Sequence, residues 1–464
     1  MSSNRRMADV FSDNVSGGGS AASHSTSGTM TGGNMADTGS RPPHHGFLRA
    51  GGIFVFMMIT ANLFEVGFTA LTAYLPGTGY ETANALFNIF YILIAPLAGI
   101  QFMTSKEVAA YHALGEAGKA RAFVTRTLTY VMIAVLWVTS LGVVLSPKIA
   151  GFLRIGNVAP VILLMGVILF YAPYPVFYGA IQGLKRFYKL GMLQFVWAGG
   201  RFVAAALAIM VLAGGVNSLL TALIITMGVC SLIAFIPARR VFEAEKRTLS
   251  PQEIIHAYSL IAPIVLTLLM MMLLKNVDLI LAKRFFSSAD AQAYTCTARV
   301  GSAFFTLSGI IMVMYPHVSE EKTLGRNPIV FLFKSMGFTA GLSALGFIVS
   351  WFSPELVMKA ITLGKDIPGA PPLIRLVGLA ILPLALTYIM VNYLLAKHYA
   401  RFLPILLGGV ILQVVLLCIR HQSPMHLLTS LGIANMIVFA VVLVYVIFEH
   451  RRYLRSANGE VLLV

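Results

Sequence analysis

The sequence is poor in charged residues, and especially poor in acidic ones. Charged residues make up 11% of its 464 residues, against about 25% in ordinary globular domains. Hydrophobic residues make up 58%, and the mean hydropathy is +0.81. This composition excludes a soluble globular protein and indicates a bundle of helices in lipid.

Cysteine and the common catalytic motifs are also scarce. The three cysteines, Cys230, Cys296 and Cys418, lie in apolar stretches without C-x-x-C spacing, which excludes a disulfide framework and a thiolate metal site. The sequence has no G-x-x-x-x-G-K-[ST] phosphate loop and no H-E-x-x-H pair. We therefore predict that the protein is not an enzyme and has no metal or cofactor.

The shortage of acidic residues leaves a net charge of +16, from 34 Lys and Arg against 18 Asp and Glu. Residues 1–46 are balanced, so the excess lies between and beside the apolar stretches. With the N-terminus placed inside, the cytoplasmic segments carry 20 Lys and Arg and the opposite segments carry 8. Because basic loops stay in the cytoplasm, we predict that both termini are cytoplasmic and that the charge serves orientation, not nucleic-acid binding.

Against these absences stand twelve apolar windows, each long enough to cross about 30 Å of hydrocarbon. They lie at roughly 48–75, 82–104, 122–145, 158–181, 190–213, 217–237, 255–282, 290–315, 332–352, 372–396, 402–420 and 427–448. The second six repeat the first six at an offset of about 210 residues. The sequence thus predicts an all-α polytopic membrane protein, with twelve transmembrane helices in two six-helix bundles related by a pseudo-two-fold axis along the membrane normal.

The flanking composition predicts the domain boundaries. Residues 1–46 hold 21 Ser, Gly and Thr and predict a disordered cytoplasmic tail. We place the bundles at 47–237 and 254–450, a cytoplasmic linker at 238–253 and a second cytoplasmic tail at 451–464. At the end of the linker, Ser250 can cap a helix that begins at Pro251.

Five ionisable residues fall inside the apolar windows. They are Glu65, Arg201, Lys275, Asp278 and Arg299. Each costs roughly 2.5 to 3.5 kcal/mol at a helix centre, so each requires a polar cavity or a partner. Together they are the candidate substrate cavity.

These residues also have structural explanations, which the sequence leaves open. Lys275 and Asp278, three residues apart, can neutralise one another, and Arg299 can bind helix-end carbonyls. Arg201 can pair with a group on a neighbouring helix that small residues allow to approach closely. Glu65 can serve as the ion-pair partner of one of the arginines. If the cations instead surround a cavity, they attract an anion, and arginine forks suit a phosphate-containing lipid head group.

Short patterns resemble a known family over about residues 48 to 450. The patterns are Ser105–Glu116, Gly179–Phe187, and Asp278 with Tyr294, Arg299 and Pro316–Ser319. They resemble the polysaccharide transporter branch, which includes the O-antigen flippases, of the multidrug/oligosaccharidyl-lipid/polysaccharide (MOP) exporter superfamily. Lipid II flippases look richer in arginine in the first two helices, where this sequence has Glu65.

The resemblance implies a multi-pass protein of the bacterial inner membrane. Such a protein would move a polyprenyl-diphosphate-linked oligosaccharide outward by alternating access, with Arg201 and Arg299 best placed to receive the diphosphate. Its partners would be the lipid-linked oligosaccharide and, beside it, glycosyltransferases and a polymerase. Two alternatives are a cation-coupled drug antiporter of the same superfamily, with Glu65 as its ion site, and a membrane component of a polysaccharide secretion complex.

Overall fold

The computed structural model describes residues 57, 60–245, 247–306, 308, 329–396 and 401–457. Regular structure in this part of the chain is entirely helical. Nine of the described helices are long and apolar enough to cross a membrane. The predicted class, an all-α polytopic membrane protein, is confirmed.

The N-terminal half contains the six helices that the apolar windows predict. They are the helical segment 60–71, α3 (Gly79–Ala113), α4 (Ala117–Val144), α6 (Ala159–Tyr171) followed by α7 (Pro173–Gly183), α8 (Phe187–Ala206) and α9 (Val216–Ala238). Shorter turns lie between them: η1 (Thr72–Tyr74), α5 (Ser146–Phe152), η2 (Leu207–Val211) and η3 (Arg239–Val241).

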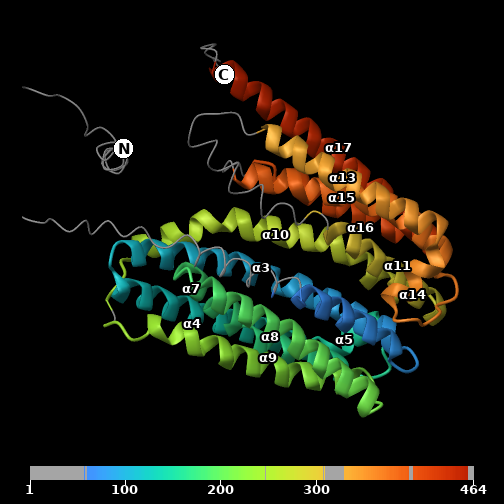
Figure 1. The fold of residues 1–464 in the computed structure, drawn as a ribbon, viewed down its shortest axis with the longest axis horizontal. Coiled ribbons are helices and arrows are strands. Elements are labelled where there is room, and N and C mark those ends of the chain that lie inside the picture. The colour runs from blue at the N-terminus through green and yellow to red at the C-terminus, as the bar shows by residue number, and fades with distance from the viewer. Residues whose placement is uncertain are drawn as a thin grey trace, which may run out of the picture. The chain divides into compact units, whose positions relative to one another are not determined.

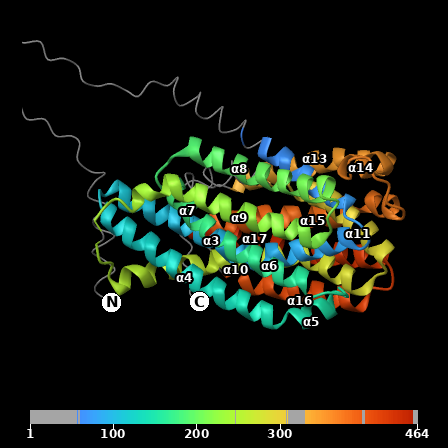
Figure 2. The ribbon, with the colours of Figure 1, turned by 90° about the horizontal axis from the view of Figure 1, so that it is seen from below.

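The C-terminal half repeats this order. Its helices are α10 (Pro251–Phe285), α11 (Ser288–Thr306), α13 (Ile329–Phe352), α15 (Ala370–Ala396), α16 (Leu403–Ile419) and α17 (Pro424–Ala457), with the short α14 (Pro354–Ile361) between α13 and α15. In Figure 2 the long helices of both halves run in the same general direction, whereas Figure 1 shows α13, α15 and α17 inclined to α3, α4 and α9. Each long helix among the described residues overlaps its predicted window, whereas the short helices α5 and α14 lie between windows.

The helix boundaries follow local chemistry. The window at 158–181 forms two consecutive helices, because Pro173 has no N–H to donate and starts α7 instead of continuing α6. Helix α10 begins at Pro251, as the capping pattern predicts. Helix α17 runs on to Ala457, so part of the predicted C-terminal tail is helical. The predicted disordered tail, 1–46, lies outside the described residues, as does the Pro316–Ser319 pattern.

Each half has its own apolar core, and two helices contribute to both cores. The N-terminal core takes in Ala257, near the start of α10, whereas Met271 and Ala282, further along α10, belong to the C-terminal core. Tyr80 of α3 also packs into the C-terminal core. Helices α3 and α10 lie side by side (Figure 1), and the contact of α3 with α10 and α11 is called the seam below.

Candidate functional site

A stripe of polar side chains on α3 organises the seam. Glu81, Asn84, Asn88 and Tyr91 are spaced three, four and three residues apart, which places them on one face of a helix. The first three are buried, with at most 3% of each exposed. Each of the four side chains lies beside a charged side chain from another helix. These charged neighbours are described in turn below.

At one end of the stripe, Arg201 of α8 pairs with Glu65 of the helical segment 60–71. The guanidinium nitrogen Nη1 lies 2.8 Å from the nearer carboxylate oxygen, and Nη2 donates to the Tyr91 hydroxyl at 3.4 Å. The guanidinium carbon lies 4.2 Å from the centre of the Phe68 ring. Arg201 is 5% exposed, so its charge is balanced by Glu65 and by ring contact instead of by water.

Arg299 of α11 reaches across the seam to the middle of the stripe. Its Nε donates to the side-chain oxygen of Asn84 at 2.7 Å, and its Nη2 contacts the same oxygen. The Asn84 amide donates in turn to the Tyr80 carbonyl at 2.7 Å, which fixes the amide orientation. Arg299 is therefore held by a neutral side chain of the other half, not by a carboxylate.

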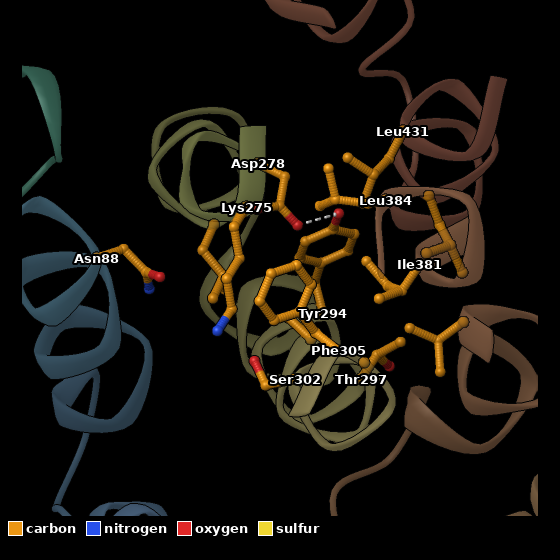
Figure 3. A pocket seen from close by; sticks show the side chains of 15 residues that line it. Asn88, Lys275, Asp278, Tyr294, Thr297, Ser302, Phe305, Ile381, Leu384 and Leu431 are labelled. Carbon is orange, nitrogen blue, oxygen red and sulfur yellow. Dashed lines mark hydrogen bonds between the residues drawn. The ribbon is translucent and has the colours of Figure 1, made fainter. Parts of the chain in front are cut away.

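Lys275 and Asp278 of α10 line a cavity of about 20 Å³ that Asn88 closes from the α3 side. Such a volume holds about one water molecule. The Tyr294 hydroxyl donates to one carboxylate oxygen of Asp278 at 2.9 Å. The other carboxylate oxygen of Asp278 is buried without a hydrogen-bond partner. Figure 3 shows the Lys275 amine turned away from Asp278 and toward Ser302.

The expected neutralisation of Lys275 by Asp278 therefore does not take the form of a direct ion pair among the described residues. The Lys275 ammonium instead lies 4.4 Å from the centre of the Phe305 ring. Asp278 and Asn88 line the same small cavity as Lys275. Lys275 thus faces the same seam as the other predicted site residues.

A second ion pair, which sequence reasoning missed, closes the other end of the stripe. Lys283 of α10 lies 3.3 Å from the Glu81 carboxylate, and the Ser288 hydroxyl donates to the same oxygen at 2.8 Å. The Glu81 side chain is fully buried and that of Lys283 is 8% exposed. The charge count placed Lys283 among the 8 Lys and Arg of the segments opposite the cytoplasm. The polar spacing along α3 was the available signal that it has a buried partner.

The arrangement leaves two cations for another ligand. Glu65 is paired with Arg201 and Glu81 with Lys283, whereas Lys275 and Arg299 form no ion pair within the residues that the structure describes. Both are on the C-terminal half and face α3 across the seam. No group of three His, Cys, Asp or Glu side chains that could hold a metal occurs in the described residues.

Further contacts join the two halves beyond Glu81. Tyr74 donates to the Leu363 carbonyl at 2.7 Å, Lys365 donates to the Ala73 carbonyl, and Gln292 donates to the Gly77 carbonyl at 3.3 Å. All of them belong to the end of the bundle at which η1 meets α11 and the loop after α14. The seam is therefore closed at that end, which the charge pattern predicts to be the extracytoplasmic one.

Two halves of six helices with a polar seam between them define a fold class of multi-pass membrane proteins. No protein-family model and no curated protein sequence matches this chain, but solved structures do. A MATE family multidrug resistance transporter of the MOP superfamily, in an inward-facing conformation, has a TM-score of 0.70 at 14% identity, covering 85% of this chain and 96% of that one.

The lipid II flippase MurJ, in an inward closed conformation, has a TM-score of 0.64 at 12% identity, covering 85% of this chain and 87% of that one. An outward-facing MATE family transporter of the MOP superfamily has a TM-score of 0.55 at 14% identity, covering 88% of this chain and 95% of that one. The chain therefore shares the fold of these transporters, and its TM-score is higher to the inward-facing MATE structure than to the outward-facing one.

Proposed function

We propose that this protein is a transporter that flips a polyprenyl-diphosphate-linked oligosaccharide by alternating access. The observation that carries the proposal is the pair of cations, Lys275 and Arg299, which face the seam without a carboxylate partner among the described residues. A cation in apolar surroundings without a counter-ion favours the entry of an anion. A diphosphate supplies that charge on a lipid that is already in the membrane.

The seam suits alternating access because the two halves meet there through reversible polar contacts. Arg299 is held by the neutral Asn84, which a phosphate oxygen can replace, since a charge-assisted hydrogen bond is about twice as strong as a neutral one. Exchange of Asn84 for substrate would release α3 from α11. Binding of the head group would then be coupled directly to separation of the two halves.

The fold likeness to MurJ supports a lipid-linked substrate. MurJ is described as a lipid II flippase, and 87% of its chain is matched. The proposal places this chain in the bacterial inner membrane with both termini cytoplasmic. It also makes glycosyltransferases that build the sugar, and a polymerase that uses it, the expected partners.

Transport by the purified protein in liposomes tests the proposal. The probe is polyprenyl-diphosphate N-acetylglucosamine with a fluorescent label on the sugar, and a membrane-impermeant quencher reports the fraction exposed. We expect Lys275→Gln and Arg299→Gln each to lower the flipping rate about tenfold or more, since hydrogen bonds to charged groups contribute about 1.5–3 kcal/mol. Arg375→Gln, at an exposed arginine of α15, is the matched control and should flip at the parent rate.

A drug antiporter coupled to a cation is the second candidate. The Glu65 side chain keeps 35% of its surface exposed despite its ion pair, so it is accessible to protons or Na⁺, and the MATE transporters with this fold include multidrug resistance proteins. This candidate predicts ethidium efflux that Glu65→Gln abolishes and Arg299→Gln leaves intact. That pair of results would refute the anion-binding seam.

The third candidate, a membrane component of a secretion complex, makes a different prediction for the same liposomes. The protein alone would expose no lipid-linked sugar, and activity would appear only when partner proteins are added. Flipping by the purified chain would exclude this role.

A further inference from the structure

A hollow of about 470 Å³ lies between α4 and the linker that joins the two halves. It is separate from the seam. Arg126 of α4 and Arg247 of the linker are its charged lining residues, and none of the lining residues is acidic. Its volume is within the range of small-molecule sites. Its two guanidinium groups, one from α4 and one from the linker, make it suited to an anion.

The charged donors in this hollow are the two arginines. The hydroxyls of Thr125 and Thr129, which also line it, donate to backbone carbonyls of α4, at 2.8 and 3.0 Å. Arg126 and Arg247 are exposed, so their N–H groups remain directed at solvent or at a ligand. Arginine binds phosphate oxygens through two parallel hydrogen bonds, which favours a phosphate over a carboxylate or halide.

The position of the hollow, beside the point where the apolar part of α4 begins, indicates that the phosphate belongs to a lipid. Residues 127–144 of α4 contain no charged residue and span about 27 Å at 1.5 Å per residue, so Arg126 lies where the apolar part of α4 begins. Tyr130, one turn further along, lines the same hollow, and tyrosine is typical of the membrane interface. Leu249 supplies an apolar wall beside the arginines.

We propose that this hollow binds the head group of an anionic phospholipid, bridging Arg126 and Arg247. The linker already contacts the N-terminal half on one side of the hollow, where Arg121 donates to the Ala244 carbonyl at 2.8 Å and the Arg247 amide donates to the Gly118 carbonyl at 3.2 Å. A bound head group adds a third link between α4 and the linker.

This link acts on α10, because α10 begins at Pro251, directly after the hollow. The Tyr258 and Thr127 hydroxyls are hydrogen-bonded at 3.2 Å, which joins the start of α10 to α4. The bound lipid thereby stabilises the arrangement in which the first part of α10 stays on the N-terminal half. The site is independent of the transported substrate.

Thermal unfolding of the purified full-length protein in a neutral detergent tests the proposal. The additions are phosphatidylglycerol, phosphatidylcholine and inorganic phosphate, each titrated separately. We expect a saturable rise in Tm with phosphatidylglycerol alone. Arg126→Gln and Arg247→Gln should each weaken the apparent affinity about tenfold, and the double variant should abolish the response.

The matched control is the double variant Arg239→Gln with Arg240→Gln, which removes two exposed arginines that do not line the hollow and should respond like the parent. An equal rise with inorganic phosphate would assign the site to a free anion, and an equal rise with phosphatidylcholine would show no head-group recognition. Either result, or a parental response from the Arg126/Arg247 double variant, overturns the proposal. Should the double variant not fold, native mass spectrometry of the single variants with retained phosphatidylglycerol gives the same comparison.

Discussion

At the scale of single residues, the charges in the apolar windows fall into two groups. Arg201 has a carboxylate, a tyrosine hydroxyl and an aromatic face as partners, so it can receive an anion only if Glu65 leaves. Arg299 and Lys275 keep no carboxylate of their own among the described residues. The structure thus favours Lys275 over Arg201 as the second cation, beside Arg299, that can bind an anion.

The Glu65–Arg201 pair gives a prediction about stability. Glu65→Gln leaves Arg201, which is 5% exposed, without its carboxylate, and we expect it to lower the free energy of unfolding by about 1–3 kcal/mol, the cost of a buried polar group that loses its partner. The double variant Glu65→Gln with Arg201→Gln removes both charges and should recover part of this loss. Thermal unfolding of the parent, both single variants and the double variant measures the coupling, and additive losses would show that the pair does not stabilise the fold.

The buried carboxylate of Asp278 gives a second residue-scale prediction. One oxygen accepts the Tyr294 hydroxyl and the other has no partner in the structure. Tyr294→Phe removes the donor and keeps the ring, so we expect a loss of about 1–2 kcal/mol in the free energy of unfolding. Tyr130→Phe, at an exposed tyrosine, should change it little. Chemical unfolding in detergent compares the two, and equal effects would mean that the Asp278–Tyr294 bond does not hold α10 to α11.

Five of the charged residues of the candidate site could be identified from the sequence, because a charge inside an apolar window is conspicuous, whereas Glu81 and Lys283 were not. The partners of these five could not be identified. Glu65 and Arg201 are 136 residues apart, and Asn84 and Arg299 are 215 apart, so only the packing of helices decides which of them meet. Glu81 was overlooked because it lies at the start of α3, where an acidic residue has an ordinary explanation in the helix dipole.

At the scale of elements, α3 has polar contacts on one face and very close packing on another. Gly179 and Gly183 of α7 form a G-x-x-x-G pair, and a side chain at either position would overlap backbone oxygens of α3, those of Gln101 and Ser105. Small residues at this spacing let two membrane helices approach closely. The glycines of α7 thereby fix the position of α3 within the N-terminal half.

This packing predicts that Gly179→Ala and Gly183→Ala each destabilise the protein by about 1–3 kcal/mol, the usual cost of overpacking. The matched control is on α13, where Gly337 and Gly341 have the same spacing but no atom within 4 Å of an added Cβ. Alanine there should be neutral. Unfolding midpoints of the four variants provide the measurement, and similar losses at both pairs would refute a special role for the α3–α7 contact.

Helix positions were the most predictable feature, since each follows from a continuous apolar window. The core into which each part of α10 packs was less predictable. The apolar surface of α10 is continuous along its length, so the sequence does not reveal where the helix leaves the N-terminal core and enters the C-terminal core. The start at Pro251 was predictable, since Ser250 and Pro251 act locally.

At the scale of the whole described chain, the contacts across the seam hold the halves in one arrangement. The ion pair between Glu81 and Lys283 and the bonds from Tyr74, Gln292 and Lys365 all join the halves at one end. The fold likeness is also greater to an inward-facing MATE transporter, with a TM-score of 0.70, than to an outward-facing one, with 0.55. The alternating access that we propose requires these contacts to separate in the other state.

The Glu81–Lys283 pair therefore sets the population of the closed arrangement. Both side chains are buried there, so Glu81→Gln or Lys283→Gln leaves an uncompensated charge in that state alone. Removal of one partner of a buried pair costs about 3–5 kcal/mol, and we expect a rise of at least about tenfold in the opposite population. Labelling of a cysteine placed at Asn88, with Cys230, Cys296 and Cys418 replaced, by an impermeant maleimide added to intact cells reports that population. Lys359→Gln, which breaks an exposed pair with Asp366, should leave labelling unchanged, and parental labelling in both seam variants would show that the ion pair does not close the seam.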